Sequence, residues 1–199
     1  IKDRIGKVKI TSSSGVIIAK TKTPMFQLFE QGLKLQKSAK KKRNETRKNG
    51  ELAITGFIDF QVIGSEGCVN IDEFRKEISP DNNKVIERPY SIKNIGNNVK
   101  TIDSLLKTIN DFKKYNFPSN KLRYIYDLKR DKNLEEFEKK MNFINILSKM
   151  DKEHIDLIKE IGIDYKNYDR FNENFKNIFD ILEIYKFVDN KVEVKGGDK

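Results

Sequence analysis

The sequence contains one cysteine, Cys68, one histidine, His154, and no tryptophan. A single thiol cannot form an internal disulfide bond, so the fold does not depend on an oxidising compartment. One cysteine and one histidine also cannot supply the ligands of the usual structural zinc sites. Nucleophilic triads need a base that is almost always histidine, whereas the charged neighbours of His154 predict an exposed side chain. We therefore expect neither a metal site nor a catalytic residue.

Long apolar runs and nucleotide-binding motifs are missing as well. No segment approaches the roughly 20 apolar residues that cross a bilayer, and the first ten residues lack the pattern of a signal peptide. The chain has no Gly-Lys-Ser/Thr phosphate loop and no Gly-x-Gly-x-x-Gly turn, which argues against ATPases, nucleotide kinases and dinucleotide-dependent oxidoreductases. The sequence thus predicts a cytoplasmic, intracellular protein with no membrane partner and no cofactor.

Positive charge, in contrast, is concentrated at one end of the chain. The net charge is +10, and residues 1–50 hold 14 Lys and Arg against 3 Asp and Glu. Residues 51–199 hold the remaining 26 basic and 27 acidic side chains, so the whole excess lies in the first quarter. Such asymmetry indicates a polyanionic partner.

The densest basic segment is interrupted only by Glu45, and on a helix its like charges would lie on neighbouring positions. Phosphates beside such a helix would relieve the repulsion. We predict that nucleic acid is the partner and that it is bound by Lys34, Lys37, Lys40, Lys41, Lys42, Arg43, Arg47 and Lys48. Two alternatives stay open, namely a solvated basic segment and an arm that docks an acidic protein partner.

The first 63 residues predict a β-hairpin, a helix and a strand. Alternating apolar residues and the turn residues 11–15 predict the hairpin over residues 7–21. Thr23-Pro24 is typical of a helix start, and Asn49-Gly50 of a helix end. Residues 51–63 predict a strand in which Asp59, opposite in parity to the apolar residues, faces solvent or a partner.

The predicted helix changes character along its length. An apolar stripe that should pack on the core is formed by Met25, Phe26, Leu28, Phe29 and Leu33. The stripe fades where the lysines begin. We therefore expect the first half of the helix to be anchored and the second half to project into solvent.

The rest of the chain is predicted to be helical. Residues 99–199 show helical periodicity up to a short final strand, Val192–Val194. A segment rich in Pro, Asn, Asp and Gly precedes them and indicates a boundary. The predicted organisation is a basic α+β unit over residues 1–80, a connecting segment over residues 81–98, and a helical portion with a terminal strand over residues 99–199.

The order of the last elements resembles that of a winged helix. A helix over residues 152–160, a second over residues 171–187 and the final strand follow one another as in that arrangement, whose second helix enters the major groove. No residue motif identifies such a family. A plain helical bundle with a terminal strand is the alternative.

Two further segments bear on function. Glu193-Val-Lys195 resembles half of the motif of the PD-(D/E)xK nucleases, in which carboxylates hold Mg²⁺, but no suitable first acid precedes it. Aromatic and basic residues also alternate between residues 113 and 130, which is typical of single-stranded nucleic-acid binding. That cluster comprises Lys113, Lys114, Tyr115, Phe117, Lys121, Arg123, Tyr124, Tyr126, Lys129 and Arg130, and its alternative is a tyrosine-bearing core helix with solvated lysines.

Taken together, the sequence predicts a helix-dominated α+β protein with an N-terminal β-hairpin–helix–strand unit and a helical portion with a winged-helix-like C-terminal part. The predicted function is a nucleic-acid-binding module, with DNA favoured over RNA, that belongs to a larger enzyme or regulator. An assembly subunit that docks an acidic partner is the first alternative, and a metal-dependent nuclease is the second. A binding protein is favoured over an enzyme.

Overall fold

The fold belongs to the α+β class and is mostly helical, as predicted. The computed structural model describes residues 11–48, 55–64, 70–79, 85–96, 99–160 and 176–188. Within these ranges the chain forms seven α-helices and one mixed sheet of three strands.

Two compact units make up the chain. One comprises residues 1–71 and 88–103, and the other comprises residues 72–87 and 104–199. The domain boundaries expected from the sequence stay a prediction.

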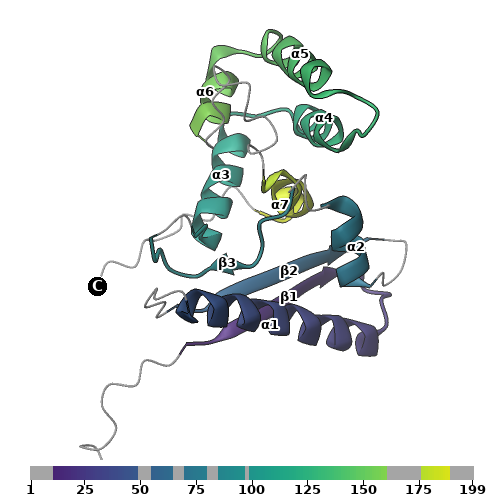
Figure 1. The fold of residues 1–199 in the computed structure, drawn as a ribbon, viewed down its shortest axis with the longest axis vertical. Helices are drawn as coiled ribbons and strands as arrows, with labels where there is room; N and C mark the ends of the chain where they lie inside the picture. Colours follow the sequence, from purple (N-terminus) through teal and green to yellow (C-terminus); the bar gives the residue numbers. More distant parts are fainter. Residues whose placement is uncertain are drawn as a thin grey trace, which may run out of the picture. The chain divides into compact units, whose positions relative to one another are not determined.

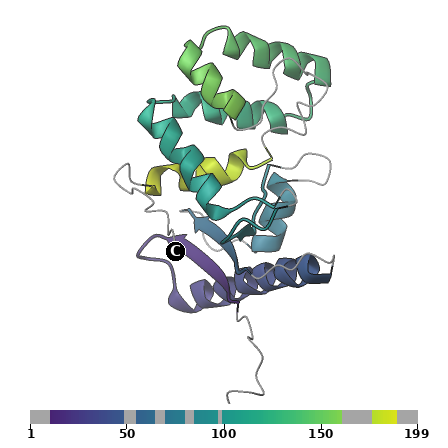
Figure 2. The ribbon, with the colours of Figure 1, turned by 90° about the vertical axis from the view of Figure 1, so that its left-hand side faces the viewer.

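The first unit is built on a strand–helix–strand crossover. Strand β1 (Ser13–Ala19) leads through helix α1 (Met25–Lys48) to strand β2 (Phe57–Ile63), which pairs with β1 in parallel. Strand β3 (Tyr90–Ser91) pairs antiparallel with β2, so the strand order is β1-β2-β3. Helix α1 lies along β1 and β2 (Figures 1 and 2) and covers one face of the sheet.

The predicted N-terminal hairpin is wrong in its turn. Ser13, Ser14 and Gly15 lie inside β1, and the partner of β1 is the later, parallel strand β2. A parallel pair needs a long crossover connection, which α1 supplies. Residues 7–10 lie outside the described residues.

Gly15 belongs in the strand because α1 passes directly over it. A Cβ atom at Gly15 would lie 2.5 Å from the carbonyl oxygen of Gly32 and 2.7 Å from the backbone nitrogen of Gln36. Only a residue without a side chain permits this approach of strand and helix backbones. The glycine that indicated a turn is therefore a packing residue.

Strand β2 is buried on both faces, and this corrects the prediction for Asp59. Asp59 is 0% exposed, and its Oδ1 accepts a hydrogen bond from the backbone nitrogen of Phe60 at 2.9 Å. The register pairs Asp59 with Gly15, so its side chain lies on the face that α1 covers. The expectation that Asp59 faces solvent or a partner is wrong because its side chain lies under α1, on a covered face of the sheet.

Helix α1 buries a different stripe from the predicted one. Met25, Phe26 and Phe29 are 77%, 66% and 68% exposed. The buried positions are instead Gln31, Leu35, Ala39 and Thr46. They run through both halves of the helix, so the prediction of an anchored first half and a projecting second half is also wrong. The face of α1 that passes over Gly15 therefore carries Leu35, while the large rings lie on other faces of the helix.

The second unit is formed mainly by short helices. They are α2 (Ile71–Ile78), α3 (Ile102–Lys114), α4 (Ser119–Arg130), α5 (Glu136–Leu147), α6 (Lys152–Glu160) and α7 (Ile178–Ile184). A 3₁₀ turn, Tyr185–Phe187, follows α7. The first residue of α2 and the first two residues of α3 belong to the first unit. Helix α4 packs against α5 and α7. Phe112 and Phe117 stack with ring centroids 4.6 Å apart, and Tyr126 and Phe179 lie 5.4 Å apart. These rings and the aliphatic side chains of α3, α4 and α7 make up the core of the unit.

Helix α7 is a core element in the described residues. Ile178, Asp180, Ile181 and Ile184 are buried, and Oδ2 of Asp180 accepts a hydrogen bond from the backbone nitrogen of Glu87 at 2.8 Å. Residues 171–175 and the predicted final strand lie outside the described residues. The winged-helix arrangement is not confirmed.

Candidate nucleic-acid interface

All eight predicted binding residues belong to α1. Lys34, Lys37, Lys40, Lys41 and Lys42 are exposed, and Arg43 is half-buried. The side chains of Arg47 and Lys48 lie outside the described residues. From Lys34 to Lys48 the helix advances about 20 Å, at 1.5 Å per residue. The basic side chains are therefore spaced regularly along one helix.

The lysine-bearing half of α1 is held to the sheet, which fixes its position within the first unit. Leu35 and Ala39 are 0% exposed and Thr46 is 5% exposed. The hydroxyl of Thr46 donates to the carbonyl oxygen of Lys42 at 2.8 Å. Nη1 of Arg43 donates to the carbonyl oxygen of Thr11 at 3.1 Å, where the chain enters β1. Arg43 thus anchors the helix, whereas the five lysines are exposed.

These five lysines carry no ion pair with any carboxylate of the described residues. The amine of Lys34 donates to Oδ1 of Asn70 at 3.4 Å, which leaves its charge uncompensated. Neighbouring lysines on successive turns repel one another. Within the described residues, the exposed part of α1 from Lys34 to Lys42 is therefore a positive surface whose lysines have no carboxylate partner.

A shallow depression marks the centre of this surface. It is lined by Lys37, Lys40, Lys41, Asn44 and Glu45 and has a volume of about 410 Å³. Its cations and the Asn44 amide are groups that contact phosphate oxygens in protein–DNA interfaces. The motif search missed Asn44, although the residue stands inside the basic run.

The aromatic–basic cluster of the second unit offers fewer free rings than its sequence suggested. Phe117 is 3% exposed and Tyr126 is 2% exposed, so neither ring is open to stacking with a base. Tyr115 and Tyr124 are the exposed members, at 41% and 47%. Lys129 is fully buried as well.

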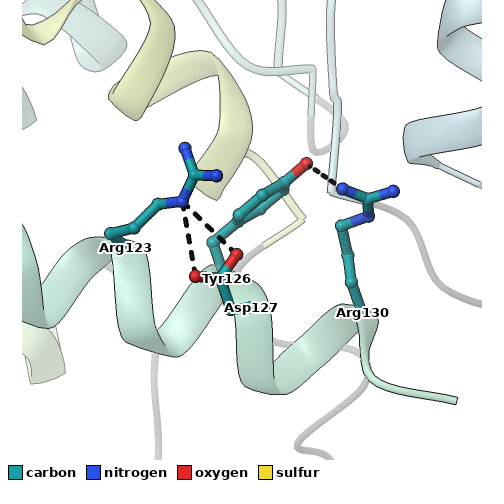
Figure 3. Close-up of polar contacts among 4 residues, drawn as sticks. All are labelled: Arg123, Tyr126, Asp127 and Arg130. Carbon is teal, nitrogen blue, oxygen red and sulfur yellow. Dashed lines mark hydrogen bonds and ion pairs between the residues drawn. The ribbon is translucent and has the colours of Figure 1, made fainter.

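The arginines of this cluster are held by local partners (Figure 3). Nε of Arg123 lies 3.3 Å from the Asp127 carboxylate, and Nη1 of Arg130 donates to the hydroxyl of Tyr126 at 2.9 Å. Burial raises the pKa of Tyr126, with Arg130 acting in the opposite direction. The tyrosine is therefore a neutral, packed residue, as the core-helix alternative has it, whereas the buried Lys129 departs from the solvated lysines of that alternative.

His154 is partly buried, which corrects the prediction of an exposed side chain. Its Nε2 lies 2.9 Å from the carbonyl oxygen of Tyr115, and its ring meets Phe117 edge-on at 5.2 Å between centroids. An Nε2–H donor satisfies that carbonyl. The histidine links α6 to the end of α3, which is a structural role.

The part of the chain that the structure describes lacks both a cluster of metal ligands and a helix suited to cross a membrane. It holds no group of three or more His, Cys, Asp or Glu side chains that could hold a metal ion. None of its helices combines the length and apolar character needed to span a membrane. Glu193 and Lys195 of the nuclease-like fragment lie outside the described residues.

The comparisons with known proteins give no family on which to base a function. No family model matches the chain, and neither curated proteins nor solved structures show a significant similarity to it. The functional argument therefore depends on the surface of α1 itself.

Proposed function

We propose that the protein is a nucleic-acid-binding module whose α1 lysines contact the phosphate backbone. The observation that carries this proposal is the row of five exposed lysines without a carboxylate partner among the described residues. Displacing counterions from a polyanion is favourable for such a row, because binding releases the condensed ions. Contacts of this kind supply affinity and little sequence preference.

Duplex DNA is the favoured polymer. An α-helix fits the major groove of B-form DNA, and α1 is a straight support for cations along its exposed arc. Single-strand binding depends on free aromatic rings, and two of the four rings in the aromatic–basic cluster are buried. The winged-helix arrangement stays a prediction, and the proposal does not depend on it.

A docking site for an acidic protein is the second candidate, because the same uncompensated lysines would also attract carboxylates. The two candidates differ in whether the purified protein binds DNA. A nucleic-acid-binding module binds duplex DNA, with its regularly spaced phosphates, at physiological salt. A docking site for an acidic protein leaves duplex DNA unbound under the same conditions.

Neutralising Lys34, Lys37, Lys40 and Lys41 together by Lys→Gln substitution is expected to weaken duplex binding at least about 100-fold at physiological salt. Each lost phosphate contact should reduce the slope of log K against log salt by about 0.9, so the slope falls by about 3 to 4. Fluorescence anisotropy with labelled duplex and single-stranded DNA and RNA, at several salt concentrations, measures both quantities. Circular dichroism checks that α1 stays folded.

The matched control is the same fourfold change at Lys107, Lys132, Lys149 and Lys152, which are exposed on the second unit. It removes the same charge from a different surface and should leave affinity within about threefold, since only the long-range field of the protein changes. Equal losses in both variants would reject α1 as the interface. Failure of the unmodified chain to bind any of the polymers would reject the proposed function.

A further inference from the structure

The outer edge of β1 lacks the features that protect an edge strand. β1 comes first in the strand order, and no strand of the described residues pairs with its free side. Its sequence, Ser-Ser-Gly-Val-Ile-Ile-Ala, contains no charge and no proline. Natural proteins guard such edges with lysine, proline or bulges, because unpaired backbone groups recruit another strand. β1 is thus a strand that is suited to pairing.

An exposed apolar stripe of α1 lies beside this edge. Phe29 and Leu33 are 68% and 40% exposed, and Met25 is 77% exposed. Together with Ser13 and Ser14 of β1 they line an open groove of about 530 Å³. The same groove therefore offers backbone hydrogen-bonding groups from the strand and apolar surface from the helix.

Charge on α1 indicates what the groove accepts. Between Met25 and Leu33 the helix carries a single charged residue, Glu30, and the lysines begin at Lys34. A nucleic acid finds no cation in this half of α1, and an acidic partner finds none either. An uncharged, apolar surface therefore fits this groove best. The same half of α1 in a second copy of the chain is such a surface.

The exposed area also matches what a pair of identical chains needs. Met25 and Phe29 are 77% and 68% exposed, and at about 200 Å² each they give about 300 Å² of apolar surface per copy. Leu33 and the 41% exposed Val16 add to this. With the backbone of β1 included, two copies would bury about 1,000 Å² or more, which is the lower limit of a specific interface.

We propose that this face is a homodimer interface, in which β1 pairs antiparallel with β1 of a second copy and the two α1 helices meet through their apolar halves. A two-fold axis perpendicular to the sheet beside Val16, the middle of β1, produces this arrangement and extends the sheet to six strands. Because α1 passes over β1 at Gly15, the two helices would face each other across this axis.

The lysine halves stay apart in this dimer. Position 32 of α1 lies over Gly15, beside the axis, so Phe29 and Leu33 of both copies meet there. The antiparallel helices then carry their lysines toward opposite ends of the dimer. The interface therefore incurs little repulsion between like charges.

Light scattering coupled to gel filtration of the full chain, over about 1 to 100 µM, tests the proposal. The expected result is twice the mass of the 23.3 kDa chain, and Phe29→Glu should raise the dissociation constant at least about tenfold. The matched control is Phe137→Glu on α5, because Phe137 is 69% exposed and lies on the other unit. It should leave the dimer intact.

Three outcomes would overturn the proposal. A wild-type chain that is monomeric at every concentration excludes the second copy, and a Phe29→Glu dimer as stable as wild type places the interface elsewhere. A monomeric full chain that dimerises only when residues 1–10 are removed would show that those residues occupy the groove. No nucleic acid is present in this experiment, so its result is separate from the test of the proposed function.

Discussion

Replacing Gly15 by alanine is expected to lower the free energy of unfolding by about 2 to 4 kcal/mol, even though it adds a single methyl group. The new Cβ atom would lie 2.5 Å from the carbonyl oxygen of Gly32 and 2.8 Å from the Cβ atom of Leu35. Two of the three nearest atoms are backbone atoms of α1 and cannot rotate away. Relief requires α1 to move off the sheet, which loosens the packing of the whole first unit. Urea unfolding followed by circular dichroism measures the loss.

Gly64→Ala is the matched control for this prediction. Gly64 follows β2 directly, is exposed, and has no atom within 4 Å of the position where a Cβ would lie. The substitution should change stability by less than about 0.5 kcal/mol. A Gly15→Ala variant as stable as the Gly64→Ala variant would contradict the close approach of α1 to β1.

Replacing Lys129 by methionine is expected to stabilise the protein at neutral pH by a few kcal/mol. Lys129 is 0% exposed on α4. Burial, helped by the nearby charge of Lys176, lowers the pKa of its ammonium group from 10.5 to about 7, against the opposite effect of Glu136 and Glu87. Methionine has a similar length and carries no proton, so it fills the same space without the cost of burying the amine.

The lowered pKa of Lys129 also predicts how the free energy of unfolding changes with pH. Between the pKa of about 7 in the folded state and 10.5 in the unfolded chain, the unfolded chain holds a proton that the folded one lacks. Stability should therefore rise with pH through that window, by up to about 5 kcal/mol in total at 1.36 kcal/mol per unit. Below the window both states hold the proton, so the full cost is present. In Lys129→Met this rise should disappear.

Urea unfolding at several pH values between about 6 and 10 distinguishes the variants. Lys132→Met, at an exposed position just beyond α4, should keep the wild-type pH dependence and the wild-type stability. If Lys129→Met were less stable than wild type at neutral pH, attraction to the neighbouring glutamates would outweigh the cost of burial. The buried lysine would then be a stabilising ion-pair partner.

Local signals in the sequence predicted most of the elements within a few residues. Thr23-Pro24 preceded the start of α1 at Met25, and the helix is described to Lys48, next to the expected end. The periodicity after Val99 predicted α3 to α6 because their apolar positions recur at helical spacing. These features depend on neighbours in the chain, so a single sequence reveals them.

The pairing of β1 and the packing of α1 could not be predicted in this way. The residues of β1 that looked like a turn pair instead with β2, which lies more than forty positions further along the chain. The rings that looked like a core stripe are exposed, while Gln31 and Ala39 are buried. Gly15 was the available signal, since a glycine in a strand permits a close strand–helix contact, but only the tertiary structure shows that α1 passes over it.

By itself, the sequence determined the helical class of most of the chain, the scarcity of histidine and cysteine, and the segment that carries the excess positive charge, because composition and local spacing decide these properties. The tertiary structure alone decided which face of α1 is buried, that Asp59 and Lys129 lie inside, and that β1 is an edge strand beside exposed apolar rings. The reason is physical: burial depends on which surfaces distant segments cover. α1 packs over Gly15 through the face that carries Leu35, so the lysines and the apolar rings on its other faces stay exposed.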